Sequence, residues 1–157
     1  MLAIFHVSCG ILALVLGGRI FVERKGTRAH VRYGWAYATS MAGVNTSSLS
    51  LYHLTGGFNL FHLLAIMSLT MVGVGLMQVL LRERLSRWMW RHYQFMSWSY
   101  VGLLTATINE AFVRIPLFKQ FTRNTTSALP LFASAAVVAA SALVIFSNQN
   151  KTLARYE

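Results

Sequence analysis

FNLFHLLAIMSLTMVGVGLMQVLL, residues Phe58–Leu81, is the stretch that decides the fold. It carries no Asp, Glu, Lys or Arg, and a helix of this length extends about 36 Å, more than the roughly 30 Å hydrocarbon core of a bilayer. One titratable side chain, His62, lies about one turn from its start. Ionisable groups inside membrane spans are commonly functional, so His62 is the first candidate site residue.

The composition of the whole chain indicates a membrane protein. Of its 157 residues, 55% are hydrophobic and only 11% are charged, whereas about a quarter of the residues in soluble domains are charged. The net charge of +10 does not indicate nucleic-acid binding, because the basic residues lie in short loops between apolar runs, as the positive-inside rule requires. The single cysteine, Cys9, excludes an internal disulfide.

Apolar runs separated by basic or glycine-containing loops predict an all-α fold, a polytopic transmembrane helical bundle. The first run ends in Arg19 and a basic loop, and is therefore read as a retained span and not as a signal peptide. Residues 1–116 are expected to form a four-helix core that carries the site, and residues 117–157 a connector, a fifth span and a short cytoplasmic tail. The expected spans are residues 2–21, 33–52, 58–81, 93–113 and 128–147.

The distribution of Lys and Arg predicts the orientation of the bundle. Eleven of the 14 lie in the loops after spans one and three and in the tail. The N-terminus is therefore expected outside and the C-terminus inside a bacterial plasma (inner) membrane. The fifth span contains SAAVVAASA, residues 134–142. Small residues permit close helix approach, so this face is a candidate contact for a homo-oligomer or a larger membrane complex, besides the lipid bilayer itself.

Three titratable groups are expected at one depth near the outer face. His6, His62 and Glu110 each lie about one turn from the outer end of a different span. Arg114 follows Glu110 by four residues, on the same helix face. Polar residues of the second span, Asn45 and Ser48, are expected at or just below this layer.

This layer is interpreted first as a metal site for redox chemistry or metal handling, and two alternatives remain open. A divalent transition metal, zinc or iron, would take the two imidazoles and the Glu110 carboxylate, with Asn45, Ser48 and Arg114 around them. A b-type haem would take His6 and His62 as axial ligands, with Arg114 near a propionate. A non-catalytic accessory or assembly subunit would use the same polar groups only for packing. No nucleophile elbow, P-loop or dinucleotide fingerprint is present.

A second pair of histidines is expected at the opposite face. His30 and His92 just precede spans two and four and are flanked by arginines. With the outer pair they would make two layers of two histidines, as in a four-helix bundle that holds two haems. The alternative is contact with lipid phosphate or helix capping. His53, beside the outer turn, is expected to be solvated.

The first span carries a stripe of small residues below its histidine. His6, Gly10, Ala13 and Gly17 follow helical spacing, which leaves room for either a flat ring or a close helix neighbour.

Four elements of the sequence form a recognisable pattern: His6-x-x-x-Gly10, the segment AHVRYGWAY at residues 29–37, the segment RHYQFM at residues 91–96, and Arg114. Together they resemble a bacterial family of predicted membrane proteins, domain of unknown function 2306. Val31 between His30 and Arg32 departs from the family pattern. The resemblance covers residues 1–116 and leaves out span five. It implies a four-helix unit and points to His6, His30, His92 and Arg114, without implying a reaction.

Overall fold

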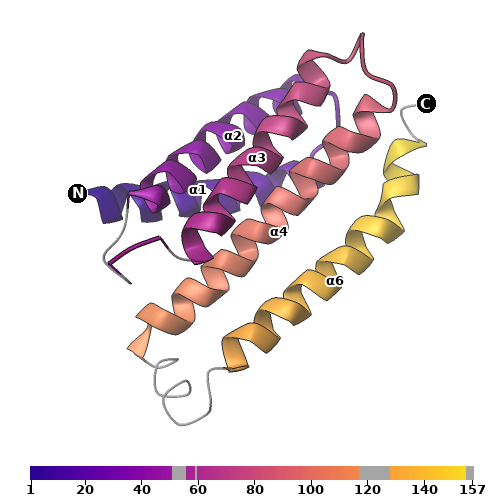
Figure 1. Ribbon diagram of the computed structural model, residues 1–157. Helices are drawn as coiled ribbons and strands as arrows, with labels where there is room; N and C mark the ends of the chain where they lie inside the picture. Colours follow the sequence, from indigo (N-terminus) through magenta and orange to yellow (C-terminus); the bar gives the residue numbers. More distant parts are fainter. Residues whose placement is uncertain (51–55, 59, 117–127, 155–157) are drawn as a thin grey trace. The chain divides into compact units, whose positions relative to one another are not determined.

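The computed structural model describes residues 1–50, 56–58, 60–116 and 128–154, and confirms an all-helical chain (Figure 1). These residues form two compact units, Met1–Val74 and Gly75–Glu157, with the boundary inside α3. The helices are α1 (Leu2–Val22), α2 (Arg28–Leu49), α3 (Leu60–Leu80), α4 (Trp88–Arg114) and α6 (Ala128–Leu153).

Three of the described helices are long and apolar enough to cross a membrane. They are α1, the His62–Leu80 part of α3, and the Leu129–Asn150 part of α6. Such helices imply a lipid bilayer environment. The more polar α2 and α4 do not reach this apolarity, so the four-helix core and the orientation remain predictions.

Two helices begin earlier than the sequence pattern predicts. α2 begins at Arg28 and α4 at Trp88, whereas residues 33 and 93 were expected. The hydrophobic run marks where a span enters hydrocarbon, but the helix itself continues outward through polar residues. At α2, Thr27 accepts a hydrogen bond from the His30 backbone N–H at 3.1 Å, a side-chain N-cap. His30 and His92 therefore lie within the first turns of helices and not before them.

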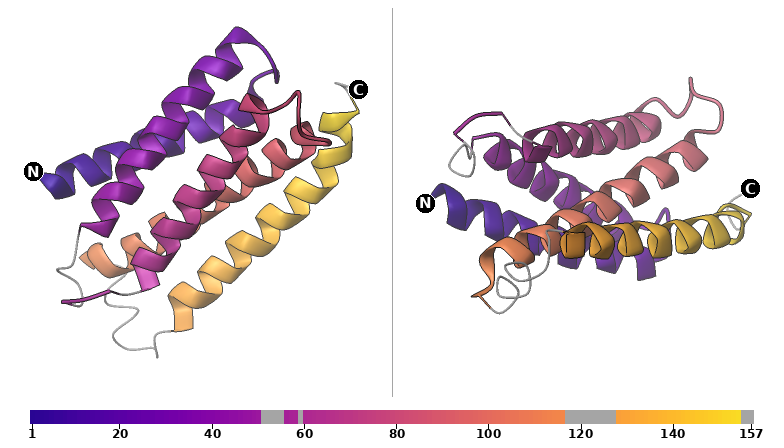
Figure 2. Two further views of the ribbon diagram at one scale, coloured as in Figure 1. Left: turned by 45° about the horizontal axis from the view of Figure 1, so that its top comes forward. Right: turned by 60° about the horizontal axis from the view of Figure 1, so that its bottom comes forward.

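The first unit is built on close packing of α1 against α2, which lie side by side and antiparallel (Figures 1 and 2). At the contact, a Cβ on Gly43 would lie 2.8 Å from the Cys9 Sγ atom and 3.3 Å from the ring of Phe5. On α1, Ala13 and Gly17 are buried. The small-residue stripe of α1 thus provides space for a neighbouring helix.

The polar residues inside α2 are satisfied within the first unit. Ser40 donates to the Ala36 carbonyl at 2.7 Å. Asn45 donates to the Met41 carbonyl at 2.8 Å and to the Ser68 hydroxyl of α3 at 3.2 Å. α2 therefore joins α1 through one face and α3 through another.

In the second unit, α4 and α6 lie side by side (Figure 2). Asn109 donates to the Ser134 hydroxyl at 2.7 Å. More than three turns away, Gln94 donates to the Gln149 side-chain oxygen, also at 2.7 Å. Two polar pairs this far apart fix both the register of α6 against α4 and the side of α6 that faces α4.

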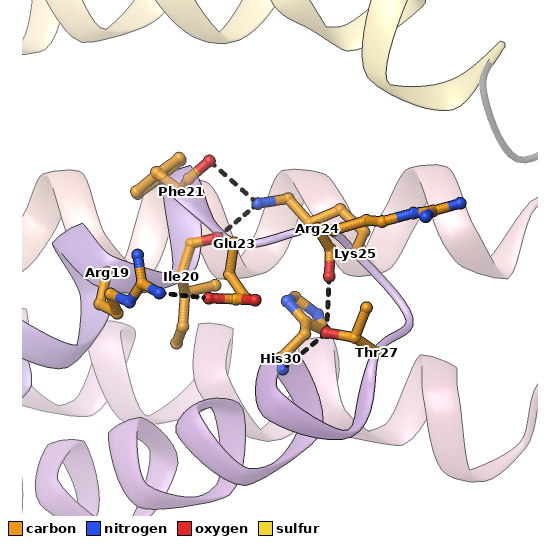
Figure 3. A network of polar contacts seen from close by, with 8 residues as sticks. All are labelled: Arg19, Ile20, Phe21, Glu23, Arg24, Lys25, Thr27 and His30. Carbon is orange, nitrogen blue, oxygen red and sulfur yellow. Dashed lines mark hydrogen bonds and ion pairs between the residues drawn. The ribbon is translucent and has the colours of Figure 1, made fainter.

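A short loop connects α1 to α2, and its side chains bond back to the last turn of α1 (Figure 3). The Lys25 ammonium donates to the carbonyls of Ile20 at 2.5 Å and Phe21 at 3.3 Å, groups that the end of a helix leaves without intrahelical partners. Beside it, Arg19 pairs with Glu23 at 2.8 Å. Burial lowers the pKa of Lys25 from its ordinary value, and the nearby Glu23 carboxylate opposes that shift.

Candidate functional site

His6 is held by α2 through one ring nitrogen. Its Nδ1 atom lies 3.1 Å from the Val44 carbonyl oxygen and 3.0 Å from the Ser47 hydroxyl oxygen. A carbonyl oxygen only accepts hydrogen bonds, so the proton of the neutral ring belongs on Nδ1. The Nε2 atom then carries the lone pair.

The bonding of Ser47 leads to the same tautomer. Its hydroxyl donates at 2.7 Å to the Gly43 carbonyl, one turn back along α2. With its single proton used there, the hydroxyl accepts from His6. Towards the His6 imidazole, Ser47 therefore acts only as a hydrogen-bond acceptor, and this contact orients the ring.

His92 in the second unit has the same arrangement. Its Nδ1 atom donates to the Gly75 carbonyl oxygen of α3 at 2.8 Å. The two helices approach closely at this point, because a Cβ on Gly75 would lie 2.8 Å from the Met96 Sδ atom and 3.3 Å from the Phe95 Cβ atom. The absence of a side chain at Gly75 therefore lets α4 approach α3 closely enough for His92 of α4 to bond to the α3 backbone.

His62 is the most buried of the described histidines. Its side chain is 2% exposed, on a helix that is apolar enough to span a membrane. Its ring stacks on Phe58, with centroids 5.3 Å apart and an angle of 28° between planes. Removing a titratable ring this completely from solvent is costly unless polar partners or a ligand compensate.

The remaining site candidates fall in several places. Asn45 bonds to Ser68 and Ser48 is half-buried, while Ser47, one residue earlier, holds His6. Glu110 is half-buried in the second unit. Arg114 is the last residue of α4, and nothing is described of its side chain. His53 lies outside the described residues.

Among the described residues, no three His, Cys, Asp or Glu side chains form a group that would hold a metal ion. His6 and His62 belong to the first unit and Glu110 to the second. The three-ligand site thus stays a prediction.

Ser47 and Gly75 are the two positioning residues that the sequence interpretation missed. A signal for Ser47 was present, since Gly43 and Ser47 form a small-x-x-x-small pair that favours close helix packing. That pair faces the histidine end of α1. Gly75 had a weaker signal, because the sequence does not show which backbone carbonyl a histidine on another helix will reach.

Comparison with known proteins gives one match. A family model described as "Predicted membrane protein (DUF2306)" matches residues 3–147. The match continues beyond residue 116, where the resemblance was expected to end, and includes most of α6. No curated protein and no solved structure matches the chain. The chain therefore belongs to the DUF2306 family of predicted membrane proteins.

Proposed function

We propose that this protein is a membrane haem protein that transfers electrons within the bilayer. His6 and His62 would be the axial ligands of one b-type haem, and His30 and His92 those of a second. The observation that carries the proposal is the repeated anchoring of imidazoles. His6 in one unit and His92 in the other each donate from Nδ1 to a backbone carbonyl of a neighbouring helix.

This anchoring suits metal coordination. Histidines that bind metals almost always donate their other ring N–H to a carbonyl, a carboxylate or water, which fixes the ring and raises the basicity of the ligating nitrogen. In both residues the bond assigns the proton to Nδ1 and the lone pair to Nε2. A bis-imidazole haem needs two such nitrogens and no carboxylate ligand.

A second candidate is a divalent metal, zinc or iron, bound by His6, His62 and Glu110. The observation in its favour is Glu110 itself, a half-buried carboxylate in the second unit, since carboxylates within membrane segments commonly serve function. This candidate gives no role to the anchoring of His92, and for that reason we favour haem.

An absorption spectrum and metal analysis of the purified protein test the proposal. We expect a Soret band and α and β bands typical of low-spin bis-histidine haem on reduction, with about two haems per chain, one for each histidine pair. Stoichiometric zinc or iron without haem bands would select the second candidate. Protein that holds neither after haem-supplemented expression would select the accessory or assembly subunit and reject both.

The proposal includes the predicted orientation, with the N-terminus outside a bacterial inner membrane. In a Cys9→Ala background, a cysteine at exposed Arg24 is expected to resist a membrane-impermeant thiol reagent in intact cells, because basic loops stay inside. The same reagent should label a cysteine at Leu2. Ready labelling at Arg24 with protection at Leu2 would reverse the orientation.

A partner for the protein would dock on α6. Ala135, Ala139 and Ala140 are exposed there, and small residues on a lipid-facing helix permit a second helix to approach closely. A second copy of the chain or another membrane subunit would fit this face.

A further inference from the structure

An exposed stripe of α2 combines two arginines with a tryptophan. Arg28, Arg32 and Trp35 follow one another at i, i+4 and i+7, so they share a helix face. All three are exposed, and the tryptophan is 49% exposed. The stripe begins at the first residue of the helix, beside the loop from α1.

The positive charge of this stripe is not neutralised by an acidic residue of its own unit. Residues 1–74 contain one acidic residue, Glu23, and its carboxylate pairs with Arg19 at 2.8 Å. The Lys25 ammonium is directed to backbone carbonyls at the end of α1. The arginines of α2 therefore present their charge outward.

The position of the stripe corresponds to the headgroup layer of a bilayer. α1 is apolar enough to span the membrane and ends at Val22, and the short loop that follows starts α2 at the same level. Arg28 and Arg32 are about 6 Å apart along the axis, and Trp35 is about 10 Å from Arg28. The interfacial layer of one leaflet is about 5–8 Å thick, and tryptophan concentrates at its inner boundary.

We propose that Arg28, Arg32 and Trp35 form a binding site for the headgroup of an anionic phospholipid. The two guanidinium groups would hold the phosphodiester through paired N–H donors. The indole would lie beside the glycerol esters, where its N–H has acceptors and its ring meets acyl chains. A zwitterionic lipid neutralises its own phosphate, so the uncompensated charge of the site selects an anionic one.

Native mass spectrometry of the full-length protein tests this site. The protein in neutral detergent is offered phosphatidylglycerol and phosphatidylcholine with identical acyl chains. We expect preferential retention of phosphatidylglycerol, and a loss of that preference on the order of tenfold or more in the Arg28→Gln/Arg32→Gln double variant. The matched control, Arg82→Gln/Arg84→Gln, removes equal charge from the α3–α4 loop and should keep the preference.

A second variant distinguishes loss of the lipid site from misfolding of the glutamine variant. Arg28→Lys/Arg32→Lys keeps the charge but removes the bidentate donors, so it should reduce the preference for phosphatidylglycerol while helicity by circular dichroism is unchanged. The proposal is overturned if the glutamine variant keeps the wild-type preference or if the control loses as much as the test variant. Displacement of the lipid by inorganic phosphate would also overturn it, because it would indicate a site for soluble anions.

Discussion

His6→Ala is expected to remove about half of the bound haem, because in the proposed two-haem assignment it deletes one axial ligand of one of the two bis-imidazole centres. His62→Ala should have the same effect, and the two changes combined should cost no more than either alone. The measurement is haem content per chain by pyridine haemochromogen absorbance, beside the intensity of the Soret band. Ser8→Ala, at an exposed position on α1, is the control and should retain full haem content.

Other results would reject this assignment in distinct ways. Complete loss of a stoichiometric non-haem metal in His6→Ala, His62→Ala and Glu110→Ala alike would indicate the single divalent site. The polar residues serve packing only if two results are found together. His6→Ala and His62→Ala would leave the metal and haem contents unchanged, and Glu110→Ala and Arg114→Ala would destabilise the protein.

Gly43→Ala is expected to destabilise the protein through the α1–α2 contact. The added Cβ would lie 2.8 Å from the Cys9 Sγ atom, and overpacking of this kind costs about 1–3 kcal/mol. Alanine in place of glycine within a helix returns about 0.5–1 kcal/mol, so a net loss of stability is expected. Thermal unfolding in detergent, followed by circular dichroism, measures the change.

Two companion variants isolate the cause. Gly34→Ala changes the same helix where no atom lies within 4 Å of the new Cβ, so it should raise stability by about 0.5–1 kcal/mol. Cys9→Ala in the Gly43→Ala background removes the clashing sulfur and should recover most of the lost stability. Equal stability of Gly43→Ala and Gly34→Ala would contradict the proposed contact.

The fold was predictable from the sequence to the extent that hydrophobicity determines it. The unbroken apolar run around His62 predicted a spanning helix, and α3 covers most of it. The small stripe from Gly10 to Gly17 correctly indicated a close helix neighbour as one of its two explanations. The starts of α2 and α4 were missed, because a capping threonine and interfacial polar residues extend helices where hydropathy has already fallen.

The site was less predictable because it depends on distances between helices. The sequence identified the histidines as candidates by their unusual polarity in apolar surroundings. It indicated Ser48 beside the layer, whereas Ser47 makes the bond to His6, since a one-residue step turns a helical side chain by about 100°. Backbone acceptors such as the Gly75 carbonyl have no sequence signature at all.

The hydrogen bonds inside α2 also bear on how the chain enters a membrane. A helix with Ser40, Asn45 and Ser47 along it is costly to transfer alone into lipid, where polar groups must find partners within the protein. Its partners are its own backbone, α1 and α3, and the loop to α1 is only residues 23–27. The marginal second helix is thus expected to insert together with the strongly apolar first helix, as one helical hairpin. Shortening or breaking α1 would then remove the helix that partners the polar face of α2, so α2 is expected to stay outside the bilayer, where water can solvate that face.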